Sequence, residues 1–283
     1  TDFDFRQYKK LKMFAHAEKS IESQDLEYGD LTVFIRIGSD FTENYYEYEI
    51  PLTFTPWGTP ATDPESIWPA ANNFDIDLEK LVGVKHRRNI AMRQAGSGVS
   101  LTFPYVEYSG DHRITVLGSP TISDVKTIMI GVRNPKKPGE VDLVPICAEV
   151  WVNELRLTDF NKQGGWAATT TLQAQLADFG QVTVAGMHSS AGFASLDSKI
   201  SDVNLEAVTQ LDISTDLELG KFFPEKAGIR VPMHFDYSET HITPEYNPLD
   251  PDIQLQDDLD SYVRKESQDS VKRLVVDYTQ RKN

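Results

Sequence analysis

The sequence predicts a mainly β protein: a jelly-roll-like β-sandwich with one helix, then two long antiparallel hairpins and a C-terminal helix. Clusters of turn-forming residues separate short strand-like segments throughout residues 1–160. From residue 164 onward, apolar and polar residues alternate over runs longer than the five or six residues of an ordinary strand. We therefore divide the chain into a sandwich over 1–160, hairpins over 161–240, and an extended loop with a helix over 241–283.

The strands of the predicted sandwich are short, and turn residues bound each of them. Pro51 should place its strand at a sheet edge or end it there, because proline cannot donate to a ladder. Strands at this spacing with a single helix are typical of a two-sheet sandwich of the jelly-roll kind. The candidate strands are Lys10–His16, Leu31–Ile37, Asn44–Phe54, Ser100–Tyr108, His112–Leu117, Val125–Val132 and Pro145–Leu157.

The helix predicted within the sandwich spans Asp77–Asn89. Asp77 can cap the first turn, and the Glu79 carboxylate complements the helix dipole there. The basic residues from Lys85 to Arg88 lie near the other end of the helix, where positive charge is favourable.

The longest alternating run is Leu205–Leu219, in which odd positions are apolar or threonine and even positions are mostly acidic or amide. A helix would scatter these apolar groups around all its sides, so the run predicts one long strand. A strand with one apolar and one strongly polar face suits an outer-membrane barrel, where lipid lies outside and water inside. A soluble sandwich is the plainer alternative.

The strand at Leu205–Leu219 has a predicted hairpin partner at Gly228–Ser238, and a second hairpin joins Trp166–Ala177 to Gln181–Met187. The connections alternate between short and long, as in outer-membrane barrels, so these are barrel-type hairpins. Four strands cannot close a barrel, so the other strands would lie outside this sequence; the start at TDFDFRQY, without Met, also suggests a piece of a longer protein. The predicted lipid-facing residues are Leu205, Ala207, Thr209, Leu211, Ile213, Thr215, Leu217, Leu219, Ile229, Val231, Met233, Phe235 and Tyr237.

The C-terminal part begins with the proline-rich segment His241–Leu259, which predicts an extended loop. Ser261–Gln280 follows and is predicted to be helical. Its apolar residues would lie near one face of such a helix. These residues are Val263, Val271, Leu274, Val275 and Tyr278.

The composition excludes several classes of function. The 283 residues include 28 basic and 43 acidic ones, a formal charge of −15, which argues against nucleic-acid binding. The single cysteine, Cys147, excludes an intrachain disulfide, and its apolar neighbours predict a buried thiol. No apolar run is long enough for a transmembrane helix.

No catalytic, cofactor-binding or metal-binding constellation is found in the sequence, so we expect no enzyme activity. The six histidines lack zinc spacing, and His234 with Asp236 fits a polar strand face better than half a metal site. The acidic stretch at 247–258 lacks the glycine turn and closing glutamate of a calcium loop. Trp57 and Trp68 flank a proline-rich loop, where they either pin the loop or stack on sugars. The second option leaves an alternative function, a surface carbohydrate- or protein-binding jelly-roll module with no transport role.

Several long strings in the second half of the chain resemble one family. They are WVNELRLTDF (Trp151–Phe160), GGWAA (Gly164–Ala168), LADFGQVTVAG (Leu176–Gly186), LELGKFFPEKAG (Leu217–Gly228) and YNPLDPDI (Tyr246–Ile253). Together they resemble the SprA/Sov family, the outer-membrane translocon of the type IX secretion system in Bacteroidota, which is also linked to gliding motility.

This resemblance implies a fragment of a very large single-chain barrel in the cell outer membrane of a Gram-negative bacterium. Such a barrel passes folded cargo proteins with a C-terminal signal to the cell surface. Its implied partners are a PorV-like outer-membrane protein, a plug protein, the secreted cargo and outer-membrane lipid. The resemblance carries no cofactor and no catalytic residues onto this sequence.

Overall fold

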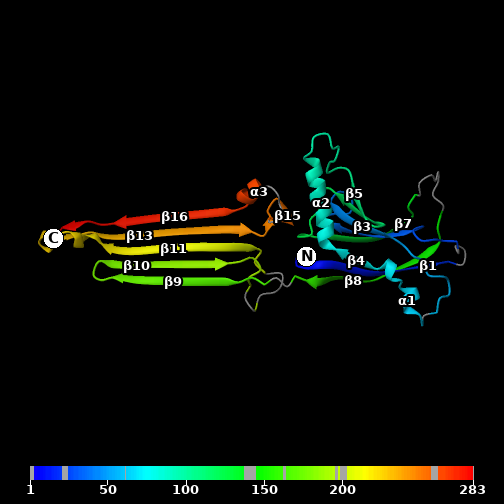
Figure 1. Cartoon of the computed structure of the whole chain (residues 1–283), viewed down its shortest axis with the longest axis horizontal. Helices are drawn as coiled ribbons and strands as arrows, with labels where there is room; N and C mark the ends of the chain where they lie inside the picture. Colours follow the sequence, from blue (N-terminus) through cyan, green and yellow to red (C-terminus); the bar gives the residue numbers. More distant parts are fainter. Residues whose placement is uncertain are drawn as a thin grey trace. The chain divides into compact units, whose positions relative to one another are not determined.

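The computed structural model describes residues 3–20, 25–60, 62–136, 145–161, 164–194, 197, 203–255 and 261–282. The chain forms two compact units, Thr1–Asn161 and Lys162–Asn283. Both units are mainly β, and their sheets are antiparallel (Figure 1).

The first unit contains a five-stranded and a three-stranded sheet. The order in the larger sheet is β5-β6-β3-β2-β7, formed by Tyr105–Ser109, His112–Leu117, Tyr45–Pro51, Thr32–Gly38 and Thr127–Arg133. The order in the smaller sheet is β4-β1-β8, formed by Phe74–Asp77, Tyr8–Lys19 and Ala148–Phe160. The strand β3 ends at Pro51 in the middle of its sheet, which confirms that the proline ends the strand.

One hydrophobic core is shared by the two sheets of the first unit. Val33, Ile35 and Ile37 point inward from β2, and Leu11 and Met13 point inward from β1. All five are at most 2 % exposed, because alternate residues of a strand face the same side. The sheets therefore pack as two layers, as the sequence predicts.

The jelly-roll detail of the prediction is not confirmed. The pairs β1–β8, β2–β7 and β3–β6 are nested as in a jelly roll. However, β2, β3, β6 and β7 all lie in one sheet of five strands, instead of being divided between two sheets of four.

The predicted helix is confirmed as α2, Leu78–Met92. Asp77 caps it by accepting a hydrogen bond of 3.1 Å from the backbone N–H of Glu79. Leu78, Leu81 and Val84 are buried, so one face of the helix completes the core. The first unit also contains the short helices α1 (Pro64–Ile67) and η1 (Ala70–Asn72).

Two smaller predictions about the first unit are wrong. The strand predicted from Ser100 begins only at Tyr105, since turns occupy the residues before it. Cys147 is exposed and not buried, whereas its neighbours Ile146 and Ala148 pack against the core.

The second unit is built on a five-stranded sheet of order β16-β13-β11-β10-β9. Its strands are Asp269–Tyr278, Pro232–Pro244, Glu206–Glu218, Gly180–Ser189 and Ala167–Leu176. Smaller elements are η3 (Leu219–Phe222), η4 (Glu225–Ala227), β12 (Ile229–Arg230), β14 (Tyr246–Asn247), β15 (Asp250–Gln254), α3 (Ser261–Glu266) and β17 (Arg281–Lys282). Part of the predicted long loop before β11, residues 195–196 and 198–202, lies outside the described residues.

The predicted C-terminal helix is wrong. Only α3 is helical, and Asp269–Tyr278 forms the strand β16, which pairs with β13 over ten residues. The apolar residues fit either period, and the β-branched Val271, Val275 and Val276 favour the pleated surface that β13 offers.

The extended loop predicted at His241–Leu259 is also largely wrong. The strand β13 continues to Pro244, and β14 and β15 pair within the segment. Residues 256–260 lie outside the described part of the chain.

Candidate functional site

The register of the second unit places apolar side chains from all five strands in one row across the sheet. Ile213 of β11 lies opposite Val184 of β10 and Tyr237 of β13. Leu172 of β9 lies opposite Val184, and Leu274 of β16 lies opposite Tyr237. Directly opposed residues share a face of the sheet, so this row is continuous.

Two further rows lie on the same face. They lie between this row and the short connections, which join β9 to β10 and β11 to β13. Together the three rows form what we call the apolar face. One added row is Ala174, Val182, Thr215, Phe235 and Val276, and the other is Leu176, Gly180, Leu217, Met233 and Tyr278.

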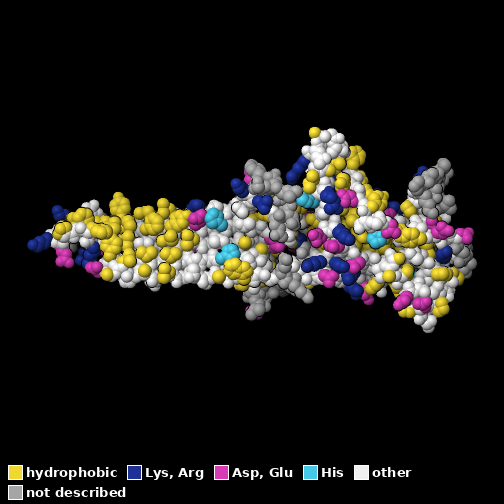
Figure 2. All heavy atoms as spheres, viewed as in Figure 1, with side chains coloured by type: hydrophobic (Ala, Val, Ile, Leu, Met, Phe, Trp, Pro, Cys, Tyr) yellow, Lys and Arg dark blue, Asp and Glu magenta, His cyan; other side chains and the backbone are white. Residues whose placement is uncertain are grey.

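The apolar face has no protein layer over it within the described part of the second unit. No described residue in the five strands is buried, and Leu172, Leu274 and Tyr278 are 67 %, 63 % and 74 % exposed. Figure 2 shows hydrophobic atoms gathered over this sheet on the side of its short connections. An apolar surface of this extent marks an interaction site, because in water it would carry the full cost of hydration.

The structure brings six of the thirteen predicted lipid-facing residues together on the apolar face. Members of the apolar face are Ile213, Thr215, Leu217, Met233, Phe235 and Tyr237. The other predicted residues of β11, Leu211, Thr209 and Ala207, continue the same side of that strand beyond the apolar face. Leu205 precedes β11. Beyond the other end of β11, Leu219 lies in η3, Ile229 lies in β12, and Val231 lies between β12 and β13.

At one end, the apolar face gives way to a polar cluster in the next rows. The Glu239 carboxylate accepts hydrogen bonds from the Tyr237 hydroxyl and from Lys272 Nζ, the latter at 2.9 Å. It also pairs with His241 Nε2 at 2.7 Å. Beside it, the His188 ring lies 4.7 Å from the Trp166 ring. Rings with a polar edge suit a boundary where one side is apolar and the other is wet.

At the other end, aromatic side chains surround the short connections. The rings of Phe179 and Phe222 meet edge to face at 4.8 Å, and Phe222 is 75 % exposed. Lys221 Nζ donates to Asp178 at 2.7 Å, and this hydrogen bond lowers the pKa of the Asp178 carboxyl and raises that of the Lys221 ammonium. The apolar character of the sheet therefore reaches its turns.

The opposite face of the sheet is a hydrogen-bonded polar surface. His234 Nδ1 lies 2.6 Å from Asp216, and His234 Nε2 lies 2.8 Å from Asp236. Gln181 donates to the same Asp216 carboxylate at 3.2 Å, and Gln173 donates to Gln181 at 3.4 Å. The predicted pair His234–Asp236 thus belongs to a wider polar chain across four strands, β9, β10, β11 and β13.

No group of three or more metal-ligating side chains suited to an ion occurs among the described residues. Within the same residues, no helix is long and apolar enough to cross a bilayer.

The comparison with protein-family models agrees with the strings that first suggested a relationship. The model of the SprA_N family, described as motility related/secretion protein, matches residues 1–259. The chain belongs to this family. The comparison with curated proteins gives no match. The predicted resemblance to the SprA/Sov family is confirmed.

Sequence reasoning missed the contribution of β16 to the apolar face of this SprA_N chain. Leu274, Val276 and Tyr278 belong to the face because they lie opposite Tyr237, Phe235 and Met233. Their spacing of two residues was a signal for a strand, but the apolar residues at 271 and 275 obscured it.

Trp57 and Trp68, on which the alternative function as a surface-binding module depends, differ in environment. Trp68 packs against Phe14 and His16, with ring centroids 6.4 and 5.7 Å away, so it pins its loop to β1. Trp57 is 50 % exposed.

Proposed function

We propose that this chain is part of a large outer-membrane β-barrel translocon that exports folded proteins bearing a C-terminal signal. Membership of a motility and secretion family is the starting point. The observation that carries the proposal is the single-layer sheet of the second unit, which is apolar on one side and polar on the other.

The apolar face supports lipid contact. A sheet that leaves its apolar side uncovered is not stable in water, because folding then removes too little apolar surface from solvent. Lipid supplies the missing apolar environment without a second protein layer. The proposed lipid-facing residues are the predicted residues that lie on β11 and β13, with Leu172, Leu274, Val276 and Tyr278 added.

The dimensions of the apolar surface also suit a bilayer. From Leu211 to Leu217 of β11, six residues at about 3.4 Å span roughly 20 Å. A tilt of about 40° reduces this to roughly 16 Å, and the apolar residues Leu219 and Phe222 of η3 lie beyond the end of the strand, toward the full apolar band of about 25 Å on outer-membrane barrels. The polar cluster at Glu239 would then lie at one membrane surface, and the phenylalanines near Phe222 at the other.

The polar face would line a water-filled interior. Carboxylates, amides and histidine on this side satisfy one another, as the chain of hydrogen bonds through Asp216 and His234 illustrates. Lipid contact on this side would leave those charges without solvent, at a high cost. Only one orientation of the sheet in the membrane is therefore favourable.

The two edges of the sheet support continuation into a larger barrel. Within the described residues, β9 pairs only with β10, and β16 pairs only with β13. An open edge in hydrocarbon would leave backbone groups without partners, so further strands would have to pair with both.

We propose that the complete protein lies in the outer membrane of a Gram-negative bacterium of the Bacteroidota. Its proposed role there is in type IX secretion and gliding motility. Its proposed partners are a PorV-like outer-membrane protein, a plug protein and the secreted cargo. The proposed role is transport and not catalysis, and it needs no cofactor bound to this chain.

The proposal is tested by complementation with two neighbouring substitutions on opposite faces of β13. In cells lacking the protein, Phe235→Arg should fail to restore export of cargo with a C-terminal signal, because it places a charge in lipid. Asp236→Arg, on the polar face, should restore it. Cargo is measured in the medium and the periplasm by immunoblot, and the protein itself in the outer-membrane fraction. Wild-type levels of cargo export in cells carrying Phe235→Arg would contradict the proposal. Recovery of the wild-type protein in the soluble fraction would also contradict it.

The alternative, a surface-binding module with no transport role, is favoured by one observation, the exposure of Trp57. It requires glycan binding that Trp57→Ala abolishes while Trp68→Ala mainly lowers stability. A glycan array with the wild-type chain and both variants decides this.

A further inference from the structure

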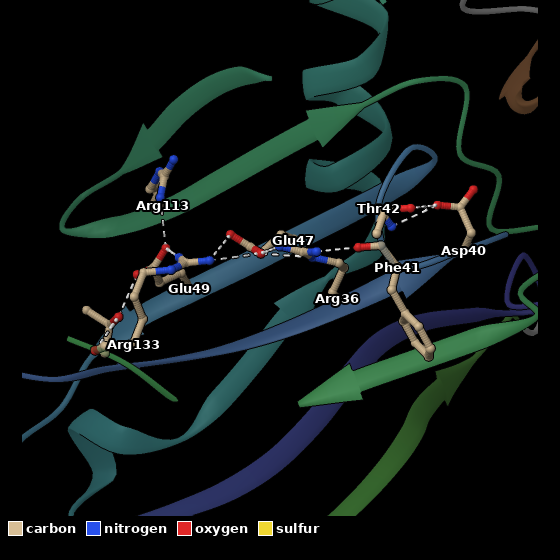
Figure 3. A network of polar contacts seen from close by, with 9 residues as sticks. Arg36, Asp40, Phe41, Thr42, Glu47, Glu49, Arg113 and Arg133 are labelled. Carbon is tan, nitrogen blue, oxygen red and sulfur yellow. Dashed lines mark hydrogen bonds and ion pairs between the residues drawn. The ribbon is translucent and has the colours of Figure 1, made fainter. Parts of the chain in front are cut away.

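A compact group of ionic side chains lies on the outer face of the five-stranded sheet in the first unit. We call it the arginine cluster: Arg36, Glu47, Glu49, Arg113 and Arg133 (Figure 3). The two glutamate side chains are only 3 % and 6 % exposed, although they belong to the sheet face opposite the core. The three arginines cover them.

Each carboxylate oxygen of the cluster has a donor. Glu47 Oε2 accepts from Arg36 Nη2 at 2.6 Å, and its Oε1 accepts from Arg133 Nη2 at 3.1 Å. Glu49 Oε2 accepts from Arg113 Nη1 at 3.1 Å and from Arg133 Nη1, and its Oε1 accepts from Thr32 Oγ1 at 2.5 Å. The acidic side of the cluster is therefore saturated.

The arginines are held in place by rings as well as by carboxylates. Arg133 lies 4.6 Å from the centroid of Phe34, and Arg36 lies 3.8 Å from that of Tyr45. Gly131 leaves room for the Phe34 ring, since a Cβ there would lie 2.4 Å from it. Guanidinium groups ordered in advance lose little freedom when they bind a ligand.

The cluster reverses the sign of the chain's charge locally. Three guanidinium groups face two carboxylates, a balance of +1, in a chain of formal charge −15. Such a local excess of positive charge attracts acidic ligands.

A groove of about 580 Å³ opens beside the cluster. Arg113, Arg133 and Lys136 supply its positive charge, while Val106 and the 69 % exposed Tyr108 form an apolar wall. Its acidic members are already engaged, Glu49 as described above and Asp111 by the Tyr28 hydroxyl. Partial burial, and then this hydrogen bond, raise the pKa of Tyr28 to about 12. The groove can hold a few residues of an extended peptide.

Arg113 is the donor best placed for a ligand. Only its Nη1 is bonded to Glu49, and its side chain is 35 % exposed. Its Nε and Nη2 have no partner among the described residues, and a guanidinium offers five N–H donors in a fork that matches a carboxylate.

We propose that this groove binds an extended acidic peptide segment of a partner protein. A glutamate or aspartate carboxylate of the peptide accepts hydrogen bonds from Arg113, and adjacent apolar side chains pack on Val106 and Tyr108. The positive balance of the cluster selects against basic segments.

The test uses the full chain in detergent and a fluorescein-labelled octapeptide of alternating glutamate and alanine, with binding followed by fluorescence anisotropy. Saturable binding is expected, and the same peptide with glutamine in place of glutamate should bind at least tenfold more weakly. Equal binding of the two peptides, or no saturation with the glutamate peptide up to 1 mM, would overturn the proposal. Displacement by inorganic phosphate at concentrations where acetate has no effect would also overturn it, because the site would then be a phosphate site.

Matched variants separate the groove from general charge. Arg113→Gln should weaken binding at least tenfold, and Tyr108→Ala a few-fold. Arg87→Gln removes an equal charge outside the groove, from a surface pair with Glu107 at 2.6 Å, and should leave the affinity within twofold of wild type. Equal losses in Arg113→Gln and Arg87→Gln would refute the site. Arg113→Lys guards against misfolding: it keeps the charge over Glu49 but not the fork, so it should weaken binding while the thermal unfolding midpoint stays near that of wild type.

Discussion

The substitution Leu274→Arg is the sharpest energetic probe of the proposed membrane sheet. Leu274 lies in the middle of β16 on the apolar face, opposite Tyr237. The next residue, Val275, lies on the polar face opposite Asp236. Leu274→Arg and Val275→Arg therefore introduce the same charge one residue apart, on opposite sides of one strand.

The expected cost of Leu274→Arg has two parts. Leu274 is 63 % exposed in the chain alone, and removing a whole leucine side chain from water stabilises by about 1.5–3 kcal/mol, so lipid contact contributes roughly 1–2 kcal/mol. An arginine on the lipid face near the middle of the bilayer costs about 2–4 kcal/mol. The sum is about 3–6 kcal/mol. Val275→Arg, which gains Asp236 as a neighbour in water, should cost no more than about 1 kcal/mol.

The assay is equilibrium urea unfolding of the complete membrane protein folded into phosphatidylcholine vesicles, followed by tryptophan fluorescence. If the apolar face were in water, exchanging an exposed leucine for arginine would change the free energy of unfolding by less than about 0.5 kcal/mol. Free energies for the two variants that agree within about 0.5 kcal/mol would refute the lipid assignment.

Three further predictions concern the first unit. Gly131→Ala should destabilise it by about 1–3 kcal/mol, because the new Cβ would meet the Phe34 ring; an unchanged urea midpoint would contradict this packing. Asp77→Ala should cost about 1 kcal/mol through loss of the cap of α2, measured by loss of helical circular dichroism on heating. The pKa of Asp40 is lowered, first by the backbone N–H of Glu43 and then by the Asn44 side chain, so the ionised group stabilises the fold above its ordinary pKa of about 3.9. That stabilisation should disappear as the pH falls below about 4, and Asp40→Asn should show a weaker dependence of the urea midpoint on pH over this range.

Local signals predicted most of the strands and the one long helix. The alternation at Leu205–Leu219 led to β11, which is Glu206–Glu218, because a period of two over many residues has no other regular solution. Asp77 marked the start of α2 because its carboxylate can meet a free backbone N–H there. Pro51 marked the end of β3 for the opposite reason, since it has no N–H to give.

Features that depend on distant partners could not be predicted. Residues 269–278 have apolar positions compatible with helix and strand, and only the edge of β13, whose paired residues lie 27 to 45 positions earlier, decides between them. The arginine cluster was not predicted either, since it joins Arg36, Glu47 and Arg133 from strands far apart in the sequence. Its local signal was only that Glu47 and Glu49 alternate with the buried Tyr46, Tyr48 and Ile50 on β3.

The most direct measurement of the central claim is the accessibility of nitroxide spin labels along β11 and β13 in the intact protein in membranes, on a Cys147→Ser background. Labels at positions 211, 213, 215, 233 and 235 should collide with oxygen dissolved in lipid. Labels at positions 212, 214, 216, 234 and 236 should collide instead with a water-soluble nickel complex. A period of two between the two reagents is the result expected of a sheet between lipid and a water-filled interior. Contact with the nickel reagent on both faces, or protection of positions 211–215 from both reagents by a second protein layer, would contradict it.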